Sequence, residues 1–342
     1  MIPPDLGRLT ILAPVPTPTS NFAPIWLAAC LGYAAEDGLD LAIELAGTPK
    51  DAADRVASGR GDLTFINIVF ALLARDRGVP LRPFYAFVRT QNRAFTVKLD
   101  SPIRQLSDLR GKTVGLHYDD PELFEFACAA LRGAGLDPLS EVTFQPLPGS
   151  PLDAARMASA VRDGEVDAVW QLDVLSGFMA AEGVPTRKLP ALMIDRLTPS
   201  SSLMALDRTL AARPAAFAVL GRAVAKATVF ALANPEAAIH TMWDHYPPGE
   251  ATETAFQHEL AALRVRLEGH RTEAAPVPKW GAISPAEIDA WQSFLLDTKA
   301  IQTRQPAATC FSDSLVADFN GFDPAPIVNA ALAPGSGRSR QR

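Results

Sequence analysis

The sequence predicts a two-lobed α/β protein in which each lobe holds a mainly parallel sheet flanked by helices. Two observations carry this prediction. The chain has 342 residues, whereas a single domain usually has about 100–150. A series of short apolar strands, polar loops and amphipathic helices also occurs twice along the chain, and strands that alternate with helices favour parallel pairing through right-handed crossovers.

The first copy of the pattern begins and ends with an apolar strand. Between them lie a loop rich in Pro, Thr and Ser, an amphipathic helix, a second strand and a short helix. Apolar periodicity and the positions of Gly and Pro set the boundaries. The expected elements, in order, are residues 9–13, 14–21, 23–37, 39–45, a helix from residue 51, and residues 63–67.

The second copy starts with a strand at residues 112–116 and repeats the same order. The clearest match is at its last strand, where residues 164–170 (GEVDAVW) correspond to residues 61–67 (GDLTFIN). Any two strand–helix–strand segments share some features, but the matching order of all the elements favours a true repeat. Two copies predict two sheets.

The rest of the chain follows a different pattern. Helical periodicity dominates residues 208–301, and we expect these helices to cover the first lobe. Residues 306–334, rich in Ala, Pro and Asp, predict a loosely packed C-terminal wrap.

Composition excludes several classes of protein. The net charge is −6 and no basic block is present, so we expect no nucleic-acid partner. The three cysteines lack metal-type spacing, so we expect no metal site, and Cys30 and Cys128 lie in apolar helical patterns that predict buried thiols. We also expect no cofactor. The first residues show no secretory signal, and the apolar stretches read as too short or interrupted for a membrane helix.

Ligands of open parallel sheets bind beyond the carboxyl ends of the strands. In each copy, polar and aromatic residues occupy these loops. We expect Tyr118 and Trp170 to stack on a ring, Asn21 and Asn67 to form hydrogen bonds, and Asp119 or Asp173 to pair with an amine or ring N–H. The candidate ligand-binding residues are therefore Asn21, Asn67, Tyr118, Asp119, Trp170 and Asp173.

Charge narrows the ligand further. Acidic residues at the helix start near Asp119, and Asp173 at the next one, would repel an anion held by backbone N–H groups. Simple helix capping explains such residues equally well. Arg89 and Arg93 would favour an anion if they faced the ligand, although arginines there are as often structural. We expect a neutral or zwitterionic ligand.

Sequence signatures of enzymes are sparse. The chain contains no nucleophile elbow, phosphate-binding loop, dinucleotide fingerprint or zinc-protease motif. His117 is the histidine best placed for chemistry, at a strand end, although a surface loop histidine is the simpler reading. No cysteine lies at a predicted strand end.

Residues 95–103 (FTVKLDSPI) and 106–115 (LSDLRGKTVG) resemble the segment that begins the second lobe in type II periplasmic binding proteins. The likeness extends over about residues 8–300 and is strongest to the alkanesulfonate, nitrate, taurine and thiamine-pyrimidine-precursor binders of ABC importers. Gly61-Asp62 before an apolar strand, and the strand ending in Trp170, also fit this group.

The resemblance implies that one lobe is inserted in the other. The first would comprise residues 8–97 and 204–330, the second residues 98–203, with a disordered tail at 331–342. It also implies a ligand cleft between the lobes, capture by hinge closure, a membrane permease as partner, a monomer and a periplasmic location. The missing signal leaves a cytoplasmic location as the alternative.

The alternative function is a cytoplasmic enzyme on the same fold. A related desulfinase carries a nucleophilic cysteine in a similar Cys-Pro-Val-Pro loop, but Ala13 holds that position here. Fungal pyrimidine-synthesising relatives use a Cys-rich segment and a histidine, of which Cys310 is the sole trace. A cytoplasmic ligand sensor is a third reading.

Overall fold

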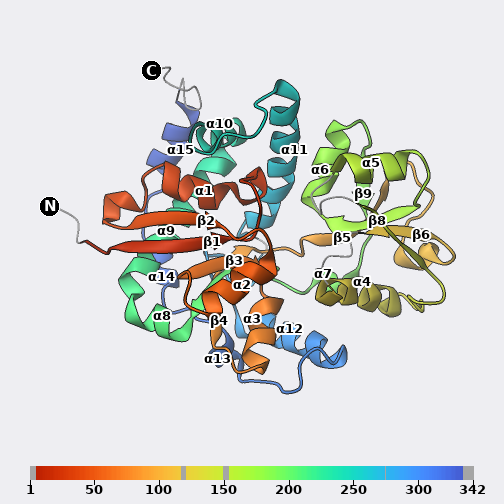
Figure 1. Ribbon diagram of the computed structural model, residues 1–342, viewed down its shortest axis with the longest axis horizontal. Helices are drawn as coiled ribbons and strands as arrows, with labels where there is room; N and C mark the ends of the chain where they lie inside the picture. The colour runs from red at the N-terminus through yellow and green to blue at the C-terminus, as the bar shows by residue number, and fades with distance from the viewer. Residues whose placement is uncertain (1–4, 117–120, 149–153, 274, 334–342) are drawn as a thin grey trace. The chain divides into compact units, whose positions relative to one another are not determined.

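The computed structural model describes residues 5–116, 121–148, 154–273 and 275–333 (Figure 1). The chain forms two compact units. The first comprises residues 1–89, 199–256 and 270–342, and the second residues 90–198 and 257–269. The sequence placed the two main crossings at 97/98 and 203/204. The structure places them at 89/90 and 198/199, because the strand that follows each crossing pairs within the sheet of the unit just entered.

The sheet of the first unit has five strands in the order β2-β1-β3-β10-β4. Parallel pairing joins β1 to β2 and β3, and β10 runs antiparallel between β3 and β4. All the strands except β10 therefore share one direction. Their bounds are β1 Arg8–Ala13, β2 Asp40–Leu45, β3 Leu63–Asn67, β4 Leu81–Val88 and β10 Ser201–Leu206.

The sheet of the second unit has the order β7-β6-β8-β5-β9. Parallel pairing joins β6 to β7 and β8, and β5 runs antiparallel between β8 and β9. The bounds are β5 Arg93–Lys98, β6 Thr113–Leu116, β7 Thr143–Pro146, β8 Ala168–Leu172 and β9 Thr186–Lys188. The two sheets thus share one topology, as the repeat predicts, and the expected α/β fold class is confirmed. In each sheet the antiparallel strand is the one that follows a crossing.

Helices cover both faces of the first sheet. On one face, Ala52 and Val56 of α2 (Pro49–Ala57) and Ala71 of α3 (Val69–Asp76) pack with Leu12 of β1 and Met204 of β10. Elsewhere in the unit, α9 is the central helix, and four other helices pack most extensively against it. These helices are α9 Pro214–Ala233, with α1 Ala23–Cys30, α10 Pro235–His245, α14 Val316–Phe319 and α15 Ala325–Leu332.

Two details of the first unit differ from the sequence prediction. The expected helix at residues 23–37 ends at Cys30, because Gly32 adopts a left-handed conformation (φ 74°); a 3-10 turn, η2 Ala35–Asp37, follows. Helix α9 is long and apolar enough to cross a membrane by length and composition, but most of it is buried inside the unit. Its apolar surface is therefore that of a core helix.

The C-terminal segment is packed rather than loose. Phe319 of α14 is fully buried against α9, where Gly221 leaves the space that the ring fills. Asn320 fixes the neighbouring loop, since its Oδ1 accepts from the Trp280 amide (3.0 Å) and its Nδ2 donates to the Trp280 carbonyl (3.0 Å). The remaining helices of the unit are α8 Asp207–Ala212, α12 Pro285–Asp297 and α13 Ala307–Cys310. Of the tail predicted at 331–342, residues 334–342 lie outside the described chain.

The second unit packs its helices around β8. Val169 of β8 lies in a core cluster with residues of α5 (Ala154–Arg162) and with Met179 of α6 (Val174–Ala181). Helix α4 (Pro121–Gly133) contacts α7 (Leu192–Asp195), and a 3-10 turn, η3 Leu106–Leu109, precedes β6. Helix α11 (Glu253–His270) is shared: residues 257–269 group with the second unit, whereas the sequence assigned this helix to the first lobe.

Candidate functional site

Each sheet has a topological switch point, the place where successive strand connections leave in opposite directions. In the first sheet it lies between β1 and β3, because β1 connects to β2 on one side and β2 connects back across β1 to β3. In the second sheet it lies between β6 and β8 for the same reason. Ligands of open α/β sheets bind at the carboxyl ends of the strands at such points.

Asn67 and Asn21 both lie at the switch point of the first unit. Asn67 is the last residue of β3, and its Oδ1 accepts from the Val69 amide (3.0 Å), which caps the start of α3. This bond leaves the Nδ2 group of Asn67 available as a donor. Asn21 is buried in the 3-10 turn η1 (Ser20–Phe22), just after β1, where its amide donates to Thr19 Oγ1 (3.3 Å).

The neighbouring polar side chains at this edge are neutral. β10 enters the sheet here, because it is antiparallel, and its first residue pairs in register with Asn67. The hydroxyl side chains at this edge are all buried: Thr19, Ser20, Ser200 and Ser201. The polar groups that surround the switch point in this unit are therefore amides and hydroxyls, which bind neutral polar groups of a ligand.

Arg89, just after β4, has a structural role. Its guanidinium donates to three backbone carbonyls of one loop, those of Ala282 (2.9 Å), Val277 (3.3 Å) and Lys279 (3.4 Å). Burial lowers the pKa of this guanidinium, and the charge of Glu287 acts in the opposite direction. The expectation that Arg89 could hold an anion finds no support in these contacts, since its bonds serve the loop.

Trp26, in the helix that follows the loop after β1, belongs to the core. Its Nε1 donates to the Thr19 carbonyl (3.0 Å), and its ring lies 5.1 Å from that of Tyr246. It is fully buried in α1. Trp26 therefore has a packing role.

Trp170 lies at the switch point of the second unit. It pairs in register with Leu116, the last residue of β6, and with Phe95 of β5. The Trp170 ring is 3% exposed and lies 4.8 Å from the Phe95 ring. Phe95 therefore already packs against the Trp170 ring, and a ligand cannot stack on the ring from that side, as the sequence had predicted it would.

Asp173 follows β8 and begins α6. Its Oδ1 accepts from the Val174 amide (2.8 Å) and from Arg266 Nη2 of α11 (2.8 Å). The Arg266 side chain is 1% exposed and that of Asp173 is 20% exposed. Burial raises the pKa of the Asp173 carboxyl, although the Arg266 charge and the Val174 N–H oppose the shift. Asp173 is thus already paired, so a ligand amine would have to compete with Arg266.

Two of the six predicted residues, Tyr118 and Asp119, lie outside the described residues, as does His117. The sequence analysis missed Arg266. Nothing local marks it, because an arginine in an amphipathic helix reads as a surface residue, and its partner stands far away in the sequence.

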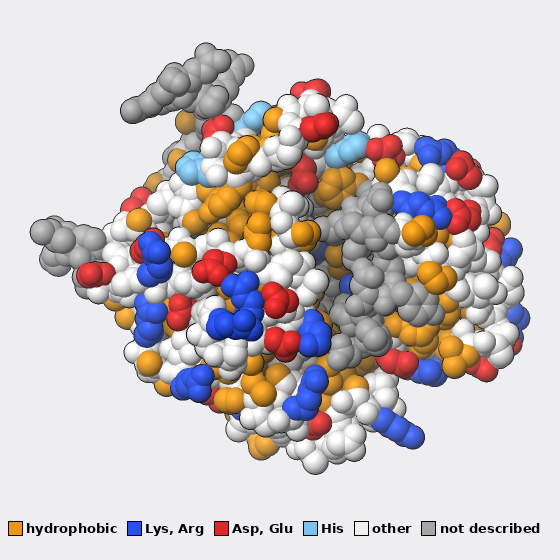
Figure 2. All heavy atoms as spheres, in the orientation of Figure 1, with side chains coloured by type: hydrophobic (Ala, Val, Ile, Leu, Met, Phe, Trp, Pro, Cys, Tyr) orange, Lys and Arg blue, Asp and Glu red, His pale blue; other side chains and the backbone are white. Residues whose placement is uncertain are grey.

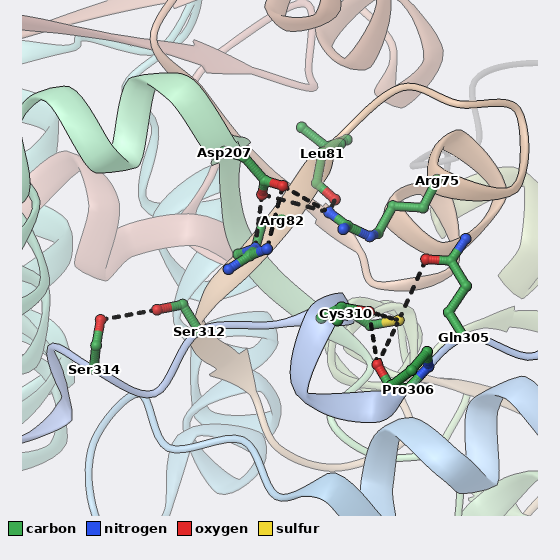
Figure 3. A network of polar contacts seen from close by, with 10 residues as sticks. Arg75, Leu81, Arg82, Asp207, Gln305, Pro306, Cys310, Ser312 and Ser314 are labelled. Carbon is green, nitrogen blue, oxygen red and sulfur yellow. Dashed lines mark hydrogen bonds and ion pairs between the residues drawn. The ribbon is translucent and has the colours of Figure 1, made fainter.

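The thiols offer no ready nucleophile. Burial raises the pKa of Cys30 to about 12 and that of Cys128 to about 11. Cys310 is buried, with its Sγ near the Pro306 carbonyl (3.7 Å) and Gln305 Oε1 (3.9 Å), and burial raises its pKa as well (Figure 3). A thiolate is the reactive form, so these thiols are poorly suited to covalent chemistry.

The same view shows a structural ion cluster in the first unit. Arg82 Nε lies 2.6 Å from Asp207 Oδ1, and Arg75 Nη1 lies 3.4 Å from the same oxygen (Figure 3). Among the described residues, no group of three or more His, Cys, Asp or Glu side chains is placed to hold a metal ion. On the face shown in Figure 2, basic and acidic side chains are interspersed rather than gathered into a basic surface.

Comparisons with known proteins show what this chain is similar to. The family model described as NMT1/THI5 like matches residues 19–238. The riboflavin-binding protein RibY of Chloroflexus aurantiacus is 26% identical over 264 residues, 75% of this chain and 72% of that protein. A 4-amino-5-hydroxymethyl-2-methylpyrimidine phosphate synthase of Aspergillus parasiticus is 26% identical over 242 residues, 67% of this chain and 68% of that protein.

Solved structures share the fold. The alkanesulfonate-binding protein SsuA of Xanthomonas axonopodis pv. citri, bound to MOPS, superposes with a TM-score of 0.63 at 16% sequence identity. The match covers 91% of this chain and 100% of that chain. The predicted type II periplasmic-binding-protein fold is confirmed.

Proposed function

The chain belongs to the NMT1/THI5-like family, and on this premise we propose that it is the substrate-binding component of an ABC-type importer. Its ligand is a small, polar, heteroaromatic molecule, captured by hinge closure and passed to a membrane permease. A periplasmic location and a monomeric state go with this role. Closure follows ligand binding if the ligand binds the closed form more tightly than the open form.

The names of two relatives narrow the ligand. One binds riboflavin, and the other makes a phosphorylated aminopyrimidine. Riboflavin contains a pyrimidine-dione ring within its tricyclic system, and the synthase product is an aminopyrimidine, so both names refer to a ring with the pyrimidine skeleton. We therefore propose a pyrimidine-bearing ligand.

The observation that carries this proposal is the neutral hydrogen-bonding edge of the first unit. Asn21 and Asn67 lie after adjacent strands at the switch point, and Asn67 keeps one donor available. A pyrimidine ring carries acceptors and donors in its plane, which amide and hydroxyl groups can match. A sulfonate or nitrate would be held better by a positively charged side chain or by free N–H groups at a helix start. Arg89, which follows β4, is engaged with backbone carbonyls, and the Val69 amide at the start of α3 donates to Asn67.

An enzyme on the same fold is the second candidate, favoured by the synthases among the relatives. Two observations favour a binding protein over cysteine chemistry. Ala13 ends β1 where the related desulfinase loop has a cysteine, and burial raises the pKa of every cysteine. Mass spectrometry of the ligand after incubation separates the two functions; a product that disappears in His117→Ala would establish the enzyme.

A thermal-shift screen tests the proposed ligand class. The probes are riboflavin, 4-amino-5-hydroxymethyl-2-methylpyrimidine, taurine, an alkanesulfonate and nitrate. We expect a pyrimidine-bearing probe to raise the melting temperature, because a ligand that binds only the folded state stabilises it. Stabilisation by the sulfonates or nitrate alone would overturn the proposal.

A variant of Asn67 tests the residue that carries it. Asn67→Asp keeps the oxygen that caps α3 but replaces the Nδ2 donor with a second acceptor, so we expect at least about a 10-fold loss of affinity. Asn234→Asp is a control for the change of a helix-capping Asn to Asp, because Asn234 Oδ1 accepts from the Ala237 amide at the start of α10 (3.0 Å); this variant additionally loses the bond from Nδ2 to the Ala331 carbonyl (2.9 Å). Equal affinity in the native protein and Asn67→Asp would remove Asn67 from the site.

A further inference from the structure

Trp170 differs from two other buried tryptophans in one respect. Trp26 Nε1 donates to the Thr19 carbonyl and Trp291 Nε1 donates to the Pro199 carbonyl, each at 3.0 Å. Trp170 Nε1 is also buried but has no hydrogen-bond acceptor in the described chain. One buried indole N–H is therefore unpaired while two equivalent groups are paired.

An unpaired buried donor calls for an explanation. The indole N–H is a donor only, and buried tryptophans normally find it a partner. Most buried polar groups in folded proteins are paired, so the exceptions often mark places where a ligand, ion or water supplies the partner. The Trp170 N–H is such an exception.

The position of Trp170 points to a ligand rather than to a fault in packing. Its strand β8 lies beside β6, and Trp170 is in register with the last residue of β6, Leu116. This pair of strands forms the switch point of the second unit, where ligands of open α/β sheets bind. The unpaired donor and the predicted binding edge coincide.

The ring that carries the donor is held in place. Side chains alternate between the two faces of a strand. Val169 lies in the core cluster with α5 and α6, and Gln171 Nε2 contacts Met179 Sδ of α6 (3.4 Å), so both occupy that face. Trp170 therefore occupies the opposite face, where Phe95 packs against its ring. A fixed ring gives its N–H one direction, which is the preorganisation that a recognition group needs.

We infer that the Nε1–H of Trp170 is a specificity-determining hydrogen-bond donor that recognises an acceptor atom of the ligand at the switch point of the second unit. The ligand class follows from the chemistry of the donor: a heteroaromatic ring that presents a ring nitrogen or a carbonyl oxygen. This inference rests on the proposed function and assigns Trp170 a donor role in place of the stacking role expected from the sequence. Analogues that lack the acceptor would leave the N–H unpaired and bind poorly.

The test compares Trp→Phe variants of the full-length protein. Trp170→Phe keeps an aromatic ring against Phe95 but removes the unpaired donor together with part of the fused ring. We expect its affinity for riboflavin or 4-amino-5-hydroxymethyl-2-methylpyrimidine, whichever binds the native protein, to fall about 10-fold, the effect of one lost hydrogen bond. Its melting temperature without ligand should fall less than that of a buried Trp→Phe variant that also strands a protein acceptor, because here no protein group loses its hydrogen-bond partner.

Trp26→Phe is the matched control. It also removes one indole N–H, but it strands the Thr19 carbonyl, so we expect a lower melting temperature. We therefore expect Trp26→Phe to lower the melting temperature more than Trp170→Phe does.

A spectroscopic measurement on the native protein does not depend on how Trp170→Phe folds. The chain has five tryptophans, so ¹⁵N labelling gives five indole signals. Variants at the other four positions identify the Trp170 signal by elimination. On titration with the same probes, we expect this signal to move downfield and its exchange with solvent to slow.

The outcomes separate the inference from the proposed function. If a probe binds the native protein but Trp170→Phe binds it equally and the Trp170 signal does not move, the inference is wrong and the function stands. If neither probe binds the native protein, the proposed function fails and the inference fails with it.

Discussion

Arg266→Met removes the charge that neutralises the buried Asp173. The methionine keeps most of the unbranched stem, so the principal loss is the 2.8 Å ion pair and hydrogen bond to Asp173 Oδ1. At that distance and an effective dielectric constant of about 20, the attraction is worth about 6 kcal/mol before desolvation. Removing one partner of a buried pair usually costs about 3–5 kcal/mol. Because Asp173 is one-fifth exposed, we expect the lower end, about 3 kcal/mol at pH 7.5.

The cost should depend on pH. Burial holds the pKa of Asp173 above its ordinary value, and Arg266 is the main group that limits the rise. Without Arg266 the pKa rises further, so the folded state holds a proton that the unfolded state has released. A carboxyl with a raised folded pKa contributes its full stability below its unfolded pKa and loses it as the pH rises through the folded pKa. The deficit of Arg266→Met should therefore grow with pH, by at most about 1.4 kcal/mol per unit.

Urea unfolding, followed by circular dichroism at pH 4.5, 6.0 and 7.5, measures this deficit. Arg264→Met is the control, because Arg264 is exposed on the same helix and a surface change there should alter the free energy of unfolding by about 0.5 kcal/mol or less. A deficit under about 1 kcal/mol at pH 7.5, or one that shrinks as the pH rises, would refute the reasoning.

Two further predictions concern packing and the thiols. In Gly177→Ala, the added Cβ would lie 2.5 Å from the Ala261 carbonyl oxygen, so α6 and α11 must move apart. We expect the free energy of unfolding, measured in urea, to fall by about 1–3 kcal/mol. Gly249→Ala is the control and should change little, because nothing lies within 4 Å of its added Cβ. Burial raises the pKa of Cys30 to about 12, so we expect folded protein at pH 8 to react with iodoacetamide far more slowly than urea-unfolded protein; equal rates would contradict the buried environment.

The sequence was sufficient to predict the elements that depend on local signals. The matched runs at 61–67 and 164–170 end in β3 and β8, the strands that occupy equivalent positions in the two sheets. Apolar runs and preceding glycines are properties of the segment itself, so they can be recognised without the rest of the chain. The same signals predicted Asn67 and Trp170 at strand ends. Asn67 does end β3, whereas β8 continues two residues beyond Trp170 to Leu172.

Features that depend on distant partners could not be predicted. Apolar periodicity carries no strand direction, so nothing in the sequence marked β5 and β10 as antiparallel. The role of Trp170 depends on Phe95, which occupies the neighbouring strand and packs against its ring. The ion pair and the pKa of Asp173 depend on Arg266, which lies 93 positions away in the sequence.

The central claim is that this chain binds a pyrimidine-bearing molecule without changing it. Isothermal titration of the native protein with riboflavin and with 4-amino-5-hydroxymethyl-2-methylpyrimidine, followed by mass spectrometry of the recovered ligand, tests it most directly. The account predicts saturable binding of at least one of the two, with the ligand recovered at its original mass. Binding of an alkanesulfonate with neither heterocycle bound, or recovery of a chemically altered ligand, would contradict it.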